Sequence, residues 1–471
     1  MNALDLCGHR TGFLCCVKGM NTGMVKDKNF YRSLLIMAVP AAFQSLISLS
    51  VSMLDNIMVG SLGDVSLAAV SLANQATALL TFIINGLAGG SAVLVSQYWG
   101  KKDLVHTREI FGVILRFAFL VLAAVSALMF IFPQAVMRIF TTDQDMIAEG
   151  AKYVRIACLS YIFFGLANSI VAMLRWIKVV KVGLLISTVS LFTNLIFNYV
   201  LIFGKLGLPA MGIQGAALAT VLARIVEFGI AVYYLFHKET QLKMRLKDVL
   251  TRNKEMFSDF VKHSLPIVFG DLQWGIVGTV KVMMIGRLGV TMTSANAIAD
   301  VVLSLAMVFT NGLTQGACVV IGNSVGAKEY DKTRQYSNTI QVMFAVIGVC
   351  VAALVFFTRN IPPTFYNVSD ETKALAATML AIGAFTHIGT CYHAACFVGI
   401  NRGAGDGNFV VKVDLICGWL VVLPLTFLAG FVLKLPLPVV YLCTRIDQCF
   451  KWLIAFIRLR GDKWIKNVTR D

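Results

Sequence analysis

Charge is what this chain of 471 residues has least of. Only 14% of its residues are Asp, Glu, Lys or Arg, whereas 58% are hydrophobic and the mean hydropathy is +0.76. Water-soluble domains carry charge on about a quarter of their residues. The composition therefore excludes an ordinary soluble protein and favours one that lies mostly in lipid.

Several chemical signatures are missing as well. No GxxxxGK[ST] phosphate-binding loop occurs, which argues against a nucleotide-driven pump. Neither a His/Glu metal set nor a Ser/Lys dyad is recognisable, and the single Gly-x-Gly-Asp sequence, 403–406, ends a predicted helix. The eleven cysteines are scattered without a CxxC pair. We therefore expect no enzyme activity, no cofactor, no structural metal and no disulfide framework.

Long apolar runs are abundant instead. A helix needs about 20 apolar residues to cross a ~30 Å hydrocarbon core, and its backbone polar groups must be satisfied internally, which excludes open strands. The sequence thus predicts an all-α polytopic membrane protein with twelve transmembrane helices. These are residues 33–59, 67–98, 109–133, 150–174, 182–203, 211–237, 264–286, 295–323, 337–357, 375–400, 411–433 and 436–458.

The positive charge is distributed unevenly between the two sides of the membrane. With the N-terminus inside, 28 of the 41 Lys and Arg residues fall in inside segments. The outside segments hold five, namely Arg138, Lys205, Arg287, Arg359 and Lys434. This asymmetry predicts a multi-pass protein of the plasma (inner) membrane with both termini cytoplasmic. The net charge of +16 therefore orients the chain in the lipid bilayer, and we expect no nucleic-acid partner.

The chain contains an internal repeat. An offset of 226 residues maps the first half onto the second without gaps, and it pairs Pro40 with Pro266, NGL (85–87) with NGL (311–313), and Thr107-Arg108 with Thr333-Arg334. Six helices per copy is an even number, so both copies enter the membrane from the same side. Two parallel, pseudo-symmetric six-helix bundles around a central cavity suit a transporter that works by alternating access.

We expect the protein to be a monomer. The repeat and the polar stretches of the sequence predict five segments. They are a cytoplasmic N-terminal tail (1–32), an N-lobe (33–237), a cytoplasmic linker (238–262), a C-lobe (263–458) and a cytoplasmic C-terminal tail (459–471).

A series of motifs extends the argument from architecture to family. In chain order they read MLDNIMVGSLGD (53–64), GGSAVLVSQYWGKKD (89–103), NLIFNYVLIFGKLGLPAMGIQG (194–215), LPIVFGDLQWG (265–275), GNSVGAKEYD (322–331) and GINRGAGD (399–406). Over about residues 30–466 the chain resembles the multidrug and toxic compound extrusion (MATE) family of secondary transporters, bacterial type. The resemblance implies a two-lobe fold and cation-coupled export of small amphipathic, often cationic compounds.

Asp55 is the first candidate for function, because charged residues inside membrane helices are rare. The resemblance implies that this aspartate is the N-lobe site of the coupling ion. A carboxylate here can ligate Na⁺ or exchange H⁺. Asn194 and Asn198, spaced i, i+4 on one helix face, are its expected partners. The family often has Asp at the second position, so Asn198 removes one negative charge, and amides that only hydrogen-bond between helices are the alternative.

The predicted substrate cavity takes most of its residues from the C-lobe. Asp271 matches an acidic position of related bacterial members and would give this lobe its own carboxylate. Gln273 and Trp274, beside it, are candidates to contact a flat aromatic substrate, and packing or lipid contact is the alternative for Trp274. Gln44 and Asp300 complete the predicted cavity residues, and the alternative for Asp300, the repeat equivalent of Asn74, is a buried ion pair.

Two further charged positions have open interpretations. Lys281 is the repeat partner of Asp55, so the two lobes carry opposite charges at equivalent depth. It is an internal partner for Asp271 or Asp300, a side chain that reaches the outer interface, or an anion-binding group. Arg224 and Glu227, spaced i, i+3, are expected to neutralise each other.

Two functions remain for this sequence. The first is an antiporter that exports organic cations or amphipathic drugs in exchange for Na⁺ or H⁺. The second is a flippase of lipid-linked precursors from the same broad superfamily, which would line its cavity with Arg and Lys. The acids among the interior candidates favour cationic cargo, whereas Lys281 argues the other way.

Overall fold

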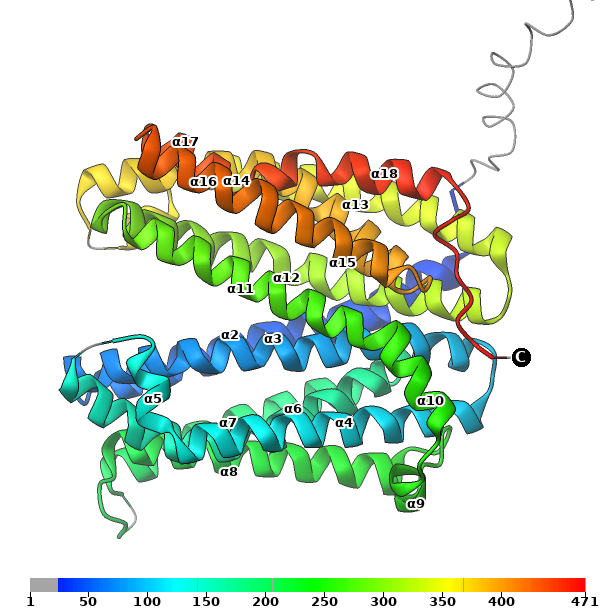
Figure 1. The fold of residues 1–471 in the computed structure, drawn as a ribbon, viewed down its shortest axis with the longest axis horizontal. Helices are drawn as coiled ribbons and strands as arrows, with labels where there is room; N and C mark the ends of the chain where they lie inside the picture. The colour runs from blue at the N-terminus through cyan, green and yellow to red at the C-terminus, as the bar shows by residue number, and fades with distance from the viewer. Residues whose placement is uncertain (1–23, 142, 206, 367, 471) are drawn as a thin grey trace, which may run out of the picture.

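The computed structural model describes residues 24–141, 143–205, 207–366 and 368–470, and this part of the chain is helical without strands (Figure 1). The first 23 residues of the predicted N-terminal tail lie outside the described residues. Eleven described helices are long and apolar enough to cross a membrane. The predicted fold class, an all-α membrane protein of two helical bundles, is confirmed.

The N-lobe is formed by the first half of the chain and occupies the lower half of Figure 1. Its helices are α2 (Lys28–Gly60), α3 (Asp64–Gly100), α4 (Leu104–Ile131), the short α5 (Pro133–Arg138), α6 (Gln144–Trp176), α7 (Lys181–Phe203) and α8 (Gly212–Tyr233), which a π-helical turn extends to Lys238. The connection to the second half carries α9 (Leu246–Leu250) and α10 (Lys254–Asp259).

The C-lobe repeats this arrangement with more irregular helices. A π-helical turn (Phe260–Ser264) joins α10 to α11, and further π-helical segments extend α14 as far as Arg402 and α15 as far as Val432. The α-helices are α11 (Leu265–Gly286), α12 (Val290–Gly326), α13 (Tyr330–Thr358), α14 (Asp370–Ala394), α15 (Gly407–Leu415), α16 (Leu423–Phe427), α17 (Leu437–Cys443) and α18 (Lys451–Arg460).

The twelfth predicted span, 436–458, differs from the expectation of one continuous helix. It consists of α17 and α18 with a 3₁₀ turn, Ile446–Cys449, between them. The break coincides with three charged residues. They are Arg445, Asp447 and Lys451, and the last two are buried, with 6% and 2% of their surface exposed.

The 226-residue repeat is present in the backbone geometry. Helices α3 and α12 have the same length and lie 226 positions apart. Each follows a glycine with positive φ, Gly63 at 110° and Gly289 at 112°, a conformation that favours glycine. Each is followed by a lysine in the left-handed region, Lys102 at 62° and Lys328 at 60°. The turns that begin and end these helices are therefore duplicated together with the helices.

The glycines of the two NGL motifs lie where the lobes touch. A Cβ atom on Gly86 of α3 would lie 2.8 Å from the Cα atom of Val268 in α11. A Cβ atom on its repeat partner, Gly312 of α12, would lie 2.5 Å from the carbonyl oxygen of Ala38 in α2. Both distances are too short for any side chain, so only glycine permits this backbone contact. The α3–α11 and α2–α12 contacts are thus equivalent halves of one pseudo-symmetric interface.

At one end of the bundle α3 and α12 also touch each other. We call this the linker end, because α9, α10 and the C-terminal segment lie there, at the right of Figure 1. A Cβ atom on Gly100 would lie 2.2 Å from the carbonyl oxygen of Asn323, and one on Gly326 would lie 1.9 Å from that of Gln97. Gly100 and Gly326 are repeat partners, as are Gln97 and Asn323. The interface is therefore closed symmetrically at this end.

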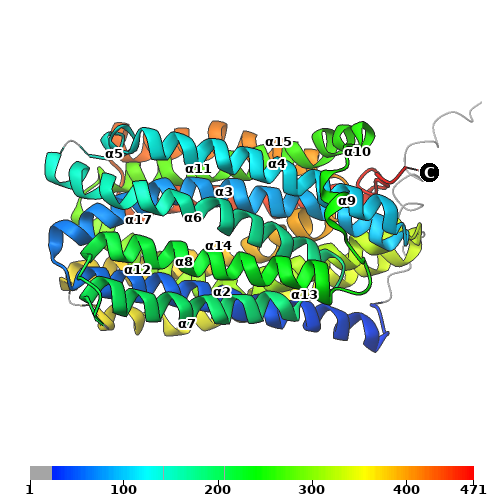
Figure 2. The same ribbon diagram turned by 90° about the horizontal axis from the view of Figure 1, so that it is seen from below.

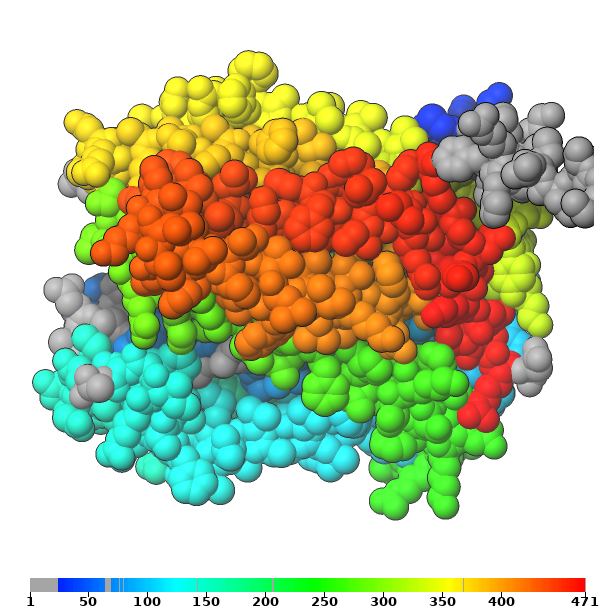
Figure 3. Space-filling model, turned by 45° about the horizontal axis from the view of Figure 1, so that its top comes forward, coloured from blue at the N-terminus to red at the C-terminus, as the bar shows by residue number. Residues whose placement is uncertain are grey.

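The C-terminal segment, residues 461–470, crosses from one lobe to the other at the linker end, and Figure 3 shows it in red against the green and cyan surface. The Gln97 amide donates to the carbonyls of Gly403 and Lys466 and accepts from the Val468 amide at 2.9 Å. The Arg470 guanidinium contacts Asp259 at 2.7 Å. The segment therefore binds both lobes while they are in contact.

Replacement of Gly326 by leucine should separate the two lobes at the linker end. The Gly326→Leu side chain has no space against α3, and overpacking of this kind costs about 1–3 kcal/mol. We expect the thermal unfolding midpoint of the purified protein in detergent to fall by several degrees, as measured by intrinsic fluorescence. Gly229→Leu is the matched control, because a Cβ atom on this helical glycine meets nothing within 4 Å. Equal midpoints for the two variants would contradict the close contact.

Candidate functional site

A cavity of about 880 Å³ lies between the lobes. Most of its wall comes from α2, α3, α6, α7 and α8 of the N-lobe, which Figure 2 shows side by side. The C-lobe contributes Asn311, Thr314, Gln315, Ala394, Val398 and Arg402. The cavity is thus an N-lobe chamber that the C-lobe covers on one side.

Asp55 lies in this wall on α2, in contact with α7. The side-chain amide of Asn198 donates to the Asp55 carboxylate at 2.5 Å and to the Asn194 oxygen at 3.1 Å. Asn194 and Asn198 are both buried, and the Asn198 oxygen has no hydrogen-bond partner among the residues that the structure describes. The structure therefore brings the three predicted residues together. It leaves one carboxylate and one free amide oxygen within a single group of polar atoms.

Arg224 and Glu227 form the expected pair on α8, next to this group. Their side chains approach to 2.6 Å, and Ser190 donates to the same Glu227 oxygen at 3.2 Å. The Arg224 guanidinium also lies 4.1 Å from the centre of the Phe164 ring. The pair lines the cavity without adding net charge to it.

Arg175 lines the cavity on the side of the linker end, where α6 terminates. Its guanidinium donates to the side-chain oxygen of Gln44 at 2.8 Å. Among the described residues it forms no ion pair with a carboxylate. In the sequence Arg175 counts among the charges of an inside segment, and the sequence therefore does not predict that Arg175 lines the cavity.

Arg402 is a second cavity residue that counts in the sequence only as an inside charge. Its contact with Asp271 changes the predicted role of that carboxylate. The two side chains form an ion pair at 2.5 Å, with a second contact at 3.1 Å. Arg402 lines the cavity, whereas Asp271 does not. A Cβ atom on Gly89 of the N-lobe would lie 3.0 Å from Arg402 and 3.4 Å from Asp271. In the C-lobe the charged group that lines the cavity is therefore the Arg402 guanidinium. Asp271, which the sequence predicts to line the cavity, instead holds this guanidinium in an ion pair.

The other predicted cavity residues occupy different places. Gln44 lines the cavity, but Gln273, Trp274 and Asp300 do not. Gln273 accepts from the Trp419 indole at 3.1 Å, and Trp274 packs edge-on against Phe82 of the N-lobe. Contact of these three residues with a substrate stays a prediction.

Comparison with known proteins is consistent with the repeat and the lobes. A family model described as MatE matches residues 40–200 and 266–428. The chain belongs to the MATE family of transporters. The two matches begin 226 residues apart, at Pro40 and Pro266, as the internal repeat requires.

MATE relatives cover nearly the whole chain. An uncharacterised transporter of Bacillus subtilis, YisQ, is 23% identical over 93% of this chain and 96% of its own length. The multidrug resistance protein MdtK of Yersinia enterocolitica is 22% identical over 85% and 87%.

Solved structures share the fold at low identity. A mutant of the Vibrio cholerae MATE transporter VcmN superposes with a TM-score of 0.84 at 15% identity, covering 93% of this chain and 99% of that one. A Pyrococcus furiosus transporter of the MOP superfamily, described as having a binding pocket of reverse polarity, gives a TM-score of 0.82 at 18% identity, covering 95% and 100%.

Within this MATE fold the C-lobe contains a buried charge network. The Lys451 ammonium contacts Asp414 at 2.9 Å and Asp447 at 2.8 Å. Asp300 accepts from Asn296 at 2.8 Å and lies 3.6 Å from Arg445. These contacts join three helical segments that are distant in sequence.

Lys281 interacts electrostatically with members of this network, two acids and two cations: Asp447, Asp300, Arg445 and Lys451. Neither acid proposed as its partner forms an ion pair with it: Asp271 is paired with Arg402, and Asp300 with Arg445. The repeat partner of Asp55 therefore lies in a different environment from Asp55 itself.

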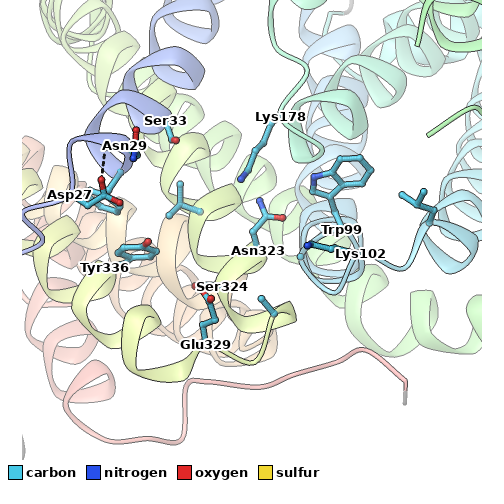
Figure 4. A pocket seen from close by; sticks show the side chains of 15 residues that line it. Asp27, Asn29, Ser33, Trp99, Lys102, Lys178, Asn323, Ser324, Glu329 and Tyr336 are labelled. Atoms are coloured by element: carbon cyan, nitrogen blue, oxygen red, sulfur yellow. Dashed lines mark hydrogen bonds between the residues drawn. The ribbon is translucent and has the colours of Figure 1, made fainter. Parts of the chain in front are cut away.

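A second cavity of about 520 Å³ lies at the linker end, between residues of both lobes (Figure 4). Figure 4 shows Asn323 below Lys178 and to the left of Trp99, and within the described part of the chain both polar atoms of its side chain lack a hydrogen-bond partner. Its repeat partner, Gln97, is fully engaged by the C-terminal segment. The two lobes are thus closed by equivalent helices but with different polar contacts.

The Lys451 network should contribute to stability. In Lys451→Met, Asp414 and Asp447 lose their shared cation, and a broken buried ion pair costs about 3–5 kcal/mol. We expect a large fall in the unfolding midpoint in detergent. Lys412→Met, at an exposed position on α15, should leave the midpoint nearly unchanged. A Lys451→Met protein as stable as the control would show that the pairs do not support the fold.

Proposed function

We propose that the protein is a secondary active antiporter that exports small amphipathic compounds in exchange for Na⁺ or H⁺. The observation that carries this proposal is Asp55. Its carboxylate lies in the wall of the cavity beside two buried amides and forms no ion pair within the described residues. A carboxylate without a cationic partner, in the wall of an intramembrane cavity, is suited to bind and release a cation.

Either coupling ion fits the chemistry of these side chains. The carboxylate and the unpartnered oxygen of Asn198 are hard donors of the kind that bind alkali and alkaline-earth cations. The same carboxylate, in a site with little water, is also suited to bind a proton. In both cases the ion removes the negative charge from the contact between α2 and α7. We infer that this change in charge alters the packing of α2, which also contacts α12 of the other lobe.

Export follows if the ion and the substrate favour opposite states of the lobe interface. The linker end, predicted to be cytoplasmic, is held by backbone contact between α3 and α12 and by the C-terminal segment. Opening at that end requires these contacts to break. Relatives named multidrug resistance proteins support drugs or similar amphipathic compounds as the cargo.

A flippase of lipid-linked precursors is the second candidate. Arg175 and Arg402 in the cavity wall favour it, since such a transporter handles polyanionic headgroups. However, Arg402 is already neutralised by Asp271, and Arg224 by Glu227. A single arginine without an acidic partner is a weak match for a diphosphate group, so the antiporter is the better-supported function.

Replacement of Asp55 tests the coupling mechanism. In cells or vesicles that export a cationic dye, Asp55→Asn should abolish gradient-driven efflux, because an amide neither carries a proton nor supplies a negative charge. Na⁺ and pH gradients are imposed separately, and the gradient that drives the wild type identifies the ion. Asp271→Asn is measured in parallel.

The control for this test is Asp331→Asn, whose side chain is 96% exposed at the linker end. It should export the dye as the wild type does. If Asp55→Asn transports normally under both gradients, Asp55 does not carry the coupling ion, and if Asp271→Asn does so too, neither carboxylate carries it.

A further inference from the structure

The charges of the cavity separate into paired and unpaired groups. Among the described residues, five charged side chains line it, and Arg224 and Arg402 are neutralised by Glu227 and by Asp271 behind the wall. Among the lining residues this leaves Asp55 and Arg175, of opposite sign, without an ionic partner. Asp55 lies toward one end of α2. Gln44, which accepts from Arg175, lies eleven residues earlier, or about 16 Å along the helix axis.

We propose that the half of the cavity next to the linker end is a subsite for a carboxylate on the transported compound, with Arg175 as its recognition group. This inference rests on the proposed transport function and names the substrate class: amphipathic compounds with a carboxylate, zwitterions included. It differs from the sequence-based expectation of purely cationic cargo.

The geometry of Arg175 supports this role. A guanidinium has five N–H donors in a plane and binds a carboxylate through two parallel hydrogen bonds. Gln44 takes one donor and, as a neutral amide, leaves the positive charge uncompensated. Gln44 is itself held against α7, where a Cβ atom on Gly183 would lie 3.1 Å from its oxygen. The guanidinium is therefore oriented before a ligand arrives, which reduces the entropic cost of binding.

The surrounding wall supplies polar and aromatic groups for the rest of such a compound. Trp176 follows Arg175, and its indole N–H donates to Ser91 at 2.9 Å, which fixes the ring at the cavity. Asn85 and Asn311 line the same cavity from opposite lobes and are repeat partners in the two NGL motifs. Their amides are placed on both sides of the interface that alternating access must open.

The test uses two dyes that differ in one charge. Rhodamine B carries a free carboxylate on a cationic chromophore, and its ethyl ester has the same chromophore without the anion. Binding to the purified protein in lipid nanodiscs is measured by fluorescence anisotropy, with empty nanodiscs subtracted. We expect the wild type to bind the acid more tightly than the ester. Arg175→Gln should weaken binding of the acid on the order of tenfold, the loss of one charge-assisted contact, and leave binding of the ester within about twofold.

Two variants complete the design. Arg155→Gln removes an exposed arginine of the same helix, outside the cavity, and should leave both affinities unchanged. Arg175→Lys keeps the charge but not the planar fork, so it should retain part of the preference for the acid. If Arg175→Gln fails to fold, the wild-type preference and Arg175→Lys decide the outcome.

Wild-type binding of the ester that is as tight as that of the acid overturns the subsite, as does an equal loss of both dyes in Arg175→Gln. Such results leave export itself intact, because a cavity for cations would give them. Binding of neither dye by the wild type also overturns the subsite. Efflux that persists in Asp55→Asn overturns the coupling mechanism instead, without altering the ratio between the two dyes.

Discussion

Close backbone contact between the lobes, permitted by glycine, is the constraint on which the rest of the structure depends. Four glycines in two repeat-related pairs, Gly86 with Gly312 and Gly100 with Gly326, lie where a Cβ atom would collide with the opposite lobe. In lipid there is no hydrophobic force between helices, so association depends on close packing. Small residues at these positions let α2, α3, α11 and α12 form the central interface. The cavity is the space that this interface leaves open.

The pseudo-symmetry of this interface does not extend to its charges. At equivalent positions of α2 and α11 stand Asp55, beside two amides at the cavity, and Lys281, near the Lys451 network. Gln97 binds the C-terminal segment, whereas its repeat partner Asn323 faces a second cavity. The two lobes thus share their helix arrangement, but they differ in the charged and polar residues at equivalent positions. The N-lobe carries the polar wall of the cavity, whereas the C-lobe holds Arg402 and Lys451 in ion pairs with its own aspartates.

Pairing decides which charged side chains are available for binding. A buried charge requires a partner or a ligand, because its desolvation is costly. Asp271, Glu227 and Asp447 have protein cations as partners. Within the described ranges, Asp55 and Arg175 have only neutral amides as hydrogen-bond partners. Ion coupling and substrate recognition are therefore proposed at these two residues, at opposite ends of one cavity.

Much of the fold was determined by the sequence alone. Apolar runs of membrane length gave the helices, because lipid requires every backbone group to be satisfied within its own segment. The 226-residue offset gave the two lobes, since matching turns such as Gly63 and Gly289 keep their backbone conformation after duplication. The contact of Asp55 with Asn198 followed from the i, i+4 spacing of two amides and from the family resemblance. These features depend on local periodicity or on direct repetition.

Only the tertiary structure decided which charges pair. Asp271 and Arg402 are 131 positions apart, and Arg175 and Gln44 are separated by the same interval. Linear spacing carries no information on such contacts. Arg175 and Arg402 were counted among the inside charges because they lie near predicted helix ends, and helix packing placed both at the cavity. The twelfth span is likewise broken where Asp447 and Lys451 form a buried ion pair, a contact that the apolar pattern does not predict.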